Sequence, residues 1–191
     1  MSRSYEDVVQ LFGKSQRIFC PMISPSGTRK LLDLEPDLPN DPRFKLYPQW
    51  IQEQLVSRQM NAFAATVDPT AGSGKMVLDI MRAGGLVVSG TDTPNAINLH
   101  GELMAYTMAG MTTFEALKAA TVNPARALAL DAGTIEAGKL ADLVMVEGDP
   151  LANIANAHHV RRVIANGRVY ELDQLVKRSA PPKKTTQAGP R

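Results

Sequence analysis

A single apolar strand between two helix-forming stretches constrains the fold of this chain more than any other feature. The run from Leu86 to Val88 follows Gly84-Gly85 and ends in the small and polar residues 89–92. Short apolar runs bounded by glycine are typical of buried strands. Apolar residues at helical spacing predict a helix over residues 73–82, and a further helix is expected to start near Asn98. Helix, buried strand and helix in this order indicate an α/β fold.

Asp92 is the candidate catalytic residue that this pattern suggests. It follows the strand within a few residues, and Pro94, which has no N–H to donate, ends any strand ladder. In parallel α/β folds the carboxyl ends of the strands carry the active site. The alternative is that Asp92 only caps a turn with its side chain, as aspartate often does.

Two stretches before this strand have weaker patterns. Residues 17–23 predict a short strand in which Pro21 favours an irregular or terminal position. Residues 24–48 are rich in proline, aspartate and glycine, so we expect a long connection with little regular structure. Such a connection is either a binding loop or a mobile insertion, and the sequence does not separate the two.

Local signals after the strand are clearer. Thr112 and Glu115 have the spacing of a capping box at the start of a helix, and Asn123-Pro124 predicts a cap followed by proline at the first helical position. Beyond Leu130, the apolar run Leu143–Val146 predicts a strand buried on both faces. Asn166-Gly167 between two β-rich runs predicts a hairpin. The chain therefore ends in a small β module.

Composition excludes several classes of function. The net charge is +2, and the tail from residue 177 to 191 contains five basic residues and no acid. We expect this tail to be disordered, and its scattered charges without aromatic residues do not indicate nucleic-acid binding. A single cysteine, Cys20, excludes an internal disulfide and a cysteine-based zinc cluster. No signal peptide or membrane-spanning run is present, so a cytoplasmic location is the default expectation.

Several motifs in register resemble the amidohydrolase superfamily, in the branch similar to imidazolonepropionase and prolidase. They extend over about half the chain and comprise Ser89-Gly-Thr-Asp-Thr-Pro94, Leu99-His-Gly-Glu-Leu103, Ala109-Gly-Met-Thr-Thr-Phe-Glu-Ala-Leu117, Ala120-Thr-Val-Asn-Pro-Ala125, Gly133-Thr-Ile-Glu-Ala-Gly-Lys-Leu-Ala-Asp142 and Val163-Ile-Ala-Asn-Gly167. No single motif is decisive, but their common order is specific.

The resemblance implies the C-terminal part of a (β/α)₈ TIM-type barrel with a small β-sandwich module. Residues 1–130 would be the barrel portion, residues 131–176 the sandwich module and residues 177–191 the tail. Asp92 would be the eighth-strand aspartate, which contacts the catalytic metal and moves the proton of the attacking water. His100 and Glu102 match the family pattern and would orient the loop from behind, or would only make hydrogen bonds at a helix start.

The remaining metal ligands of such enzymes are not found in this chain. The family pattern has a His-x-His motif on the first strand, a lysine carbamate or carboxylate on the fourth, and histidines on the fifth and sixth. Only His100, His158 and His159 occur here, and all follow Asp92. Because neighbouring residues of an extended segment point to opposite faces, we expect His158 and His159 to be surface residues that do not share an ion.

We therefore expect the C-terminal segment of a metal-dependent hydrolase, inactive by itself, that acts on carbon–nitrogen bonds other than peptide bonds. The expected cofactor is a divalent metal, zinc by resemblance, which this chain alone should bind poorly at Asp92. Expected partners are a small amide, cyclic amide or dipeptide-like substrate and either an N-terminal barrel half or a second copy of the chain. The alternative is a non-catalytic, truncated homologue that serves as a binding or assembly module.

Overall fold

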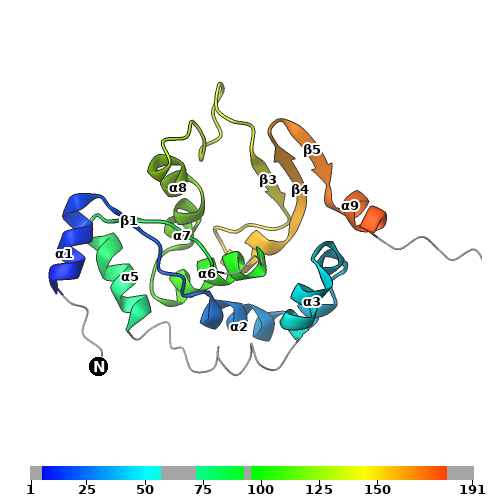
Figure 1. Cartoon of the computed structure of the whole chain (residues 1–191), viewed down its shortest axis with the longest axis horizontal. Coiled ribbons are helices and arrows are strands. Elements are labelled where there is room, and N and C mark those ends of the chain that lie inside the picture. The colour runs from blue at the N-terminus through cyan, green and yellow to red at the C-terminus, as the bar shows by residue number, and fades with distance from the viewer. Residues whose placement is uncertain (1–5, 57–71, 93–95, 180–191) are drawn as a thin grey trace, which may run out of the picture.

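The computed structural model describes residues 6–56, 72–92 and 96–179, which form a mixed α/β structure (Figure 1). This confirms the predicted class. In chain order the elements are α1 (Glu6–Ser15), β1 (Ile18–Phe19), α2 (Ser24–Leu34), the 3₁₀ turns η1 (Leu38–Asn40) and η2 (Pro42–Leu46), α3 (Gln49–Val56), α5 (Ser73–Arg82), β2 (Leu86–Val87), α6 (Ala96–Met108), α7 (Thr113–Ala120), α8 (Val122–Ala127), β3 (Leu143–Val146), η3 (Ile154–His158), β4 (Val160–Ala165), β5 (Arg168–Glu171) and α9 (Leu172–Ser179).

Strands β1 and β2 form a parallel pair in which Ile18 aligns with Leu86 and Phe19 with Val87. The pairing continues by one hydrogen bond, from the Val88 amide to the Phe19 carbonyl at 3.0 Å. The strand predicted over residues 17–23 is thus confirmed only at its start. Pro21 has no amide hydrogen to extend the ladder, and Met22 has a positive φ of 51°.

The predicted connection over residues 24–48 is wrong in its first part, because α2 occupies residues 24–34. Pro25 is tolerated in the first helical turn, where a missing N–H leaves no hydrogen bond unmade. Thr28 and Leu31 are buried against the rest of the core. Burial of one helix face therefore outweighs the loop-like composition, and the remaining prolines lie in or near the 3₁₀ turns.

The centre of the described fold is the crossing of α2 and α6 (Figure 1). Gly27 and Gly101 let the two backbones approach closely: a Cβ on Gly101 would lie 1.9 Å from Thr28 Oγ1. The core around this crossing contains side chains with almost no exposed surface, among them Leu31, Val77, Ile80, Val87, Leu103 and Tyr106. Among the described residues, no helix is both long and apolar enough to cross a membrane.

The last part of the described chain is an antiparallel sheet in the order β3-β4-β5. The predicted hairpin is confirmed, because Asn166 (φ 48°) and Gly167 (φ 73°) form the turn between β4 and β5. The prediction that β3 is buried on both faces is wrong, since Val144 and Met145 are 59% and 49% exposed. An apolar run is buried on two sides only where layers cover both faces, and the described residues leave both faces of β3 partly open.

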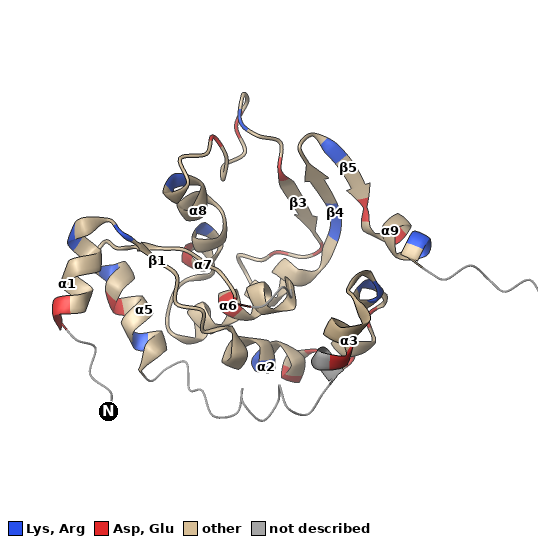
Figure 2. Cartoon of the chain, viewed as in Figure 1, with Lys and Arg blue, Asp and Glu red and all other residues tan. Residues whose placement is uncertain are grey.

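Two further predictions need correction. Helix α9 continues to Ser179, so the predicted disordered tail begins with three helical residues; residues 180–191 lie outside the described part. Helix α8 begins at Val122, before the predicted cap, and Asn123 Nδ2 instead donates to the Val87 carbonyl at 2.7 Å. Acidic and basic residues are spread over many elements and do not gather on one of them (Figure 2).

Candidate functional site

Asp92 lies beyond the carboxyl end of the parallel pair, exposed to solvent. The segment leading to it is fixed at its start, where the Ser89 amide and hydroxyl both donate to the Ala119 carbonyl, at 2.8 and 3.2 Å. A Cβ on Gly90 would lie 2.5 Å from the Cys20 sulfur, so the chain leaving β1 packs directly against the chain leaving β2. Residues 93–95, including Pro94, lie outside the described part.

The described residues do not assemble a metal site around Asp92. In the described part of the chain, Asp92 does not belong to any group of three side chains whose ligand atoms are close enough to share an ion. A catalytic zinc site needs three protein ligands. A metal held by Asp92 would therefore need further ligands from outside the described residues, and we derive no reaction step through it.

Glu102 lies fully buried on α6, next to the segment that follows β1. Neither carboxylate oxygen has a hydrogen bond of ordinary geometry, although the backbone of residues 22–24 and the Tyr106 hydroxyl lie nearby. Burial raises the pKa of the Glu102 carboxyl to about 7. Tyr106 in turn donates to the Val88 carbonyl at 3.1 Å, which links α6 to the end of β2. Glu102 is thus a buried acid beneath the strand ends.

His100 faces a different region, because side chains two residues apart on a helix do not share a face. Its ring centroid is 6.1 Å from that of His158, and its Nδ1 is buried without a partner. Burial, together with His158 and Arg43, lowers the pKa of His100 to about 4. It lines a largely apolar cavity of about 300 Å³ whose wall includes Phe44, Tyr47, Ile97 and His158.

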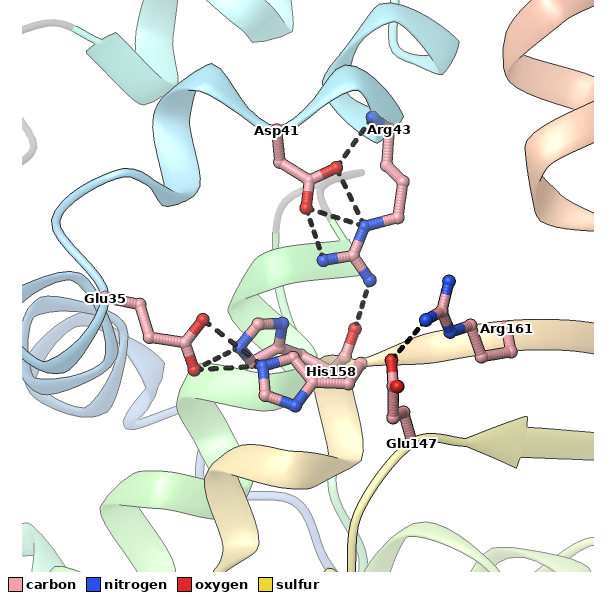
Figure 3. A network of polar contacts seen from close by, with 7 residues as sticks. Glu35, Asp41, Arg43, Glu147, His158 and Arg161 are labelled. Atoms are coloured by element: carbon pink, nitrogen blue, oxygen red, sulfur yellow. Dashed lines mark hydrogen bonds and ion pairs between the residues drawn. The ribbon is translucent and has the colours of Figure 1, made fainter.

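His158 and His159 are not the outward-facing surface pair that the sequence predicted. His158 is only 4% exposed, and both imidazoles reach the carboxylate of Glu35. The prediction assumed an extended backbone, whereas His158 ends the 3₁₀ turn η3 and His159 has φ −76° and ψ 55°. The chain turns between the two residues, and their ring centroids therefore lie only 4.2 Å apart. Figure 3 shows Glu35 facing His158.

We call Glu35, His158 and His159 the Glu35 cluster. No local signal in the sequence points to Glu35, which lies 123 residues from His158 in a stretch that resembles a loop. Partial burial raises the pKa of Glu35, but hydrogen bonds from the two histidines outweigh this and the pKa lies below its usual value. Burial lowers the pKa of His158, and Glu35 offsets only part of that effect.

The sequence model of the Amidohydrolase family matches residues 69–170, slightly more than half of the chain. The chain belongs to the amidohydrolase family. The matched region contains Asp92, His100, Glu102 and both histidines of the Glu35 cluster, whereas Glu35 precedes it. The superfamily resemblance noted from the motifs is confirmed.

Two amidohydrolase relatives are similar over only part of their length. One is the 5-methylthioadenosine/S-adenosylhomocysteine deaminase of Thermoanaerobacter pseudethanolicus, 32% identical over 154 residues, which covers 66% of this chain and 35% of the relative. Another is the adenine deaminase of Methanosphaera stadtmanae, 40% identical over 73 residues, covering 38% of this chain and 12% of the relative. The chain thus spans about a third or less of these relatives.

Solved structures show the same partial coverage. A Xaa-Pro dipeptidase with bound methionine in its active site is similar with a TM-score of 0.60 and 24% identity, over 87% of this chain and 37% of that one. Molinate hydrolase is similar with a TM-score of 0.57 and 21% identity, over 95% and 39%. At these identities the likeness concerns the fold of this amidohydrolase and not its substrate.

Proposed function

We propose that this chain contributes the eighth-strand aspartate, Asp92, to a metal-dependent amidohydrolase that hydrolyses carbon–nitrogen bonds other than peptide bonds. The family match over residues 69–170 carries the proposal. The position of Asp92 after a parallel strand supports it, because that end of a barrel bears the active site. Two relatives are named as deaminases, which cleave a carbon–nitrogen bond that is not a peptide bond.

In the same proposal β1 and β2 are the seventh and eighth strands of a (β/α)₈ barrel. Residues 1–130 form the barrel portion, and residues 131–176, with the sheet β3-β4-β5, belong to a β-sandwich module. Two strands cannot close a barrel, so strands from an N-terminal barrel half or from another copy must supply the rest. The missing zinc ligands would come with those strands.

Asp92 then acts as a proton carrier. Its exposed carboxylate accepts a proton from the attacking water and passes it to the leaving nitrogen, and a small amide, cyclic amide or dipeptide-like compound fits this chemistry. Glu102 would hold the segment after β1 in place from behind, since it lies fully buried beside residues 22–24. His100 lies on the same helix as Glu102, α6, and would help to orient the loop from the other face of that helix.

The test is reconstitution with an N-terminal amidohydrolase half that supplies the first six strands. We expect hydrolysis of a panel of amides and cyclic amides only in the mixture with zinc. Asp92→Asn should lower the turnover rate about 100-fold or more while leaving association of the halves unchanged, because loss of a positioned acid–base group has effects of this size. Full activity of the Asp92→Asn mixture would refute the assignment.

A non-catalytic binding or assembly module is the second candidate. The observation that favours it is that Asp92 has no companion ligands in the described part of the chain. This candidate predicts that the halves associate but never hydrolyse any substrate of the panel, and that Asp92→Asn changes nothing measurable. Co-sedimentation together with the activity assay separates the two.

A further inference from the structure

The Glu35 cluster has the composition and spacing of a metal site. His158 Nε2 lies 2.8 Å from Glu35 Oε1, and His159 Nε2 lies 3.2 and 3.3 Å from the two carboxylate oxygens. One ligand atom of each residue lies within 4.8 Å of the other two. Two ligands bound to the same tetrahedral zinc are about 3.3 Å apart, because each lies ~2.0–2.1 Å from the ion. The observed spacing needs only small side-chain movements to reach that value.

The backbone holds the three side chains in this arrangement. Arg43 Nη1 donates to the His158 carbonyl at 2.6 Å, and Asp41 fixes Arg43 through a charged hydrogen bond at 2.5 Å (Figure 3). The Glu147 amide donates to the His159 carbonyl at 2.8 Å. At the carboxylate ligand, the Glu35 amide donates a hydrogen bond to the Leu31 carbonyl of α2 at 2.9 Å. A site whose ligands are held before binding loses less entropy when the ion enters.

The cluster is accessible on one side and shielded on the other. His158 is buried, whereas the side chains of Glu35 and His159 are 31% and 34% exposed. His159 also lines an open hollow together with Asn156 and Arg161. The positive charge of Arg161 is countered by Glu147 at 2.6 Å. An ion can therefore enter from solvent, and a water molecule can occupy the fourth position.

The Glu35 cluster offers two imidazole nitrogens and one carboxylate oxygen as ligand atoms. Imidazole binds a metal ion in its neutral form. Imidazole ligands suit zinc and its neighbours in the transition series, whereas magnesium and calcium prefer oxygen.

We propose that Glu35, His158 and His159 bind one zinc ion through one carboxylate oxygen and two Nε2 atoms, with water as the fourth ligand. None of the three residues lies at the carboxyl end of β1 or β2, so this ion is additional to any metal that Asp92 would bind. Because Glu35 directly follows α2 and the two histidines lie where η3 leads into β4, the ion cross-links the helical part of the chain to the three-stranded sheet.

The test is zinc binding to the full chain, purified without a histidine tag and stripped with chelator, measured by calorimetry and equilibrium dialysis near neutral pH. We expect one zinc per chain. Glu35→Gln and His159→Gln should each weaken binding about 100-fold or more, because loss of a direct ligand exceeds the ~10–100-fold effect of an outer-shell change. Both replaced side chains are partly exposed, so the variants should fold, which circular dichroism in chelator checks.

Two matched controls show whether zinc binds at the Glu35 cluster or elsewhere on the chain. Glu53→Gln replaces an exposed acid of α3 that is not a member of the cluster, and Asp92→Asn removes the proposed catalytic carboxylate; neither should change the affinity more than about threefold. Cobalt offered in place of zinc should give the intense visible bands of four-coordinate Co²⁺ in wild type and in both controls, and not in Glu35→Gln or His159→Gln.

Four results would overturn the proposal. Three of them are no stoichiometric zinc in wild type, equal affinity in wild type and His159→Gln, or retention of the cobalt bands in Glu35→Gln. Each would leave the Glu35 cluster as a hydrogen-bonded contact only. Zinc that is lost in Asp92→Asn but kept in His159→Gln would also overturn it, and would contradict the separate expectation that Asp92 alone binds zinc poorly. Failure of either proposal is thus recognisable by itself.

Discussion

Replacing the buried acid Glu102 should change how the stability of this chain depends on pH. Burial raises the pKa of this carboxyl from 4.5 to about 7 in the folded chain. Between those two pH values the folded state keeps a proton that the unfolded state has lost, so the free energy of unfolding falls as pH rises. The difference between the pKa values corresponds to about 3 kcal/mol, an order-of-magnitude figure.

His100 acts in the opposite direction. Burial lowers the pKa of its imidazole from 6.5 to about 4, so the unfolded state binds the proton in that window and stability rises with pH. Over the pH range that both windows share, the contributions of Glu102 and His100 nearly cancel. Wild type should therefore show little net slope from these two groups, whereas Glu102→Gln should become more stable as pH rises and His100→Gln less stable.

Urea unfolding followed by circular dichroism from about pH 5 to pH 8 measures this difference. Glu102→Gln, which keeps the shape of the side chain without its charge, should gain about 3 kcal/mol relative to wild type across the range. The exposed Glu53 provides the matched control, and Glu53→Gln should run parallel to wild type. If Glu102→Gln also runs parallel to wild type, the carboxyl is not a buried acid with a raised pKa and the reasoning is refuted.

Three further changes are checked by the same unfolding measurement. Thr112→Ala breaks the capping box, in which Thr112 Oγ1 accepts a hydrogen bond from the Glu115 amide at 3.1 Å. It should lower the free energy of unfolding by about 1 kcal/mol, and no change would mean that the cap does not stabilise the fold. Gly101→Ala forces a Cβ to within 1.9 Å of Thr28 Oγ1. The free energy of unfolding should fall by about 2 kcal/mol or more, and an unchanged value would contradict the close crossing of α2 and α6. Asp92→Asn, at an exposed position, should stay within about 0.5 kcal/mol of wild type, and a larger loss would indicate a structural role.

Local signals in the sequence predicted local structure well. The helix over residues 73–82 is α5, the capping box of Thr112 opens α7, and Asn166-Gly167 forms the turn of the hairpin. Each of these depends on residues that lie close together in the chain, such as an apolar face at helical spacing or a turn that needs positive φ. Propensity and spacing describe such features because the interacting groups are neighbours in sequence.

Segments whose conformation depends on distant partners were predicted less well. Residues 24–34 have the composition of a loop, yet they form α2 because Thr28 and Leu31 are buried in the core, where Gly101 allows α6 to approach. Likewise Val144 and Met145 were predicted to be core residues and lie half exposed. In both cases the outcome depends on which other element covers the residue, which the pattern within one segment does not contain.

The sequence by itself determined the family, the α/β class and the place of Asp92 after a buried strand, because these follow from ordered motifs and from periodicity along the chain. Only the tertiary structure decided that Glu102 is a fully buried acid and that Glu35 meets His158 and His159. A turn at the end of η3 and a contact across 123 residues bring the last three together. Neither is encoded in local spacing, since both depend on how the core packs.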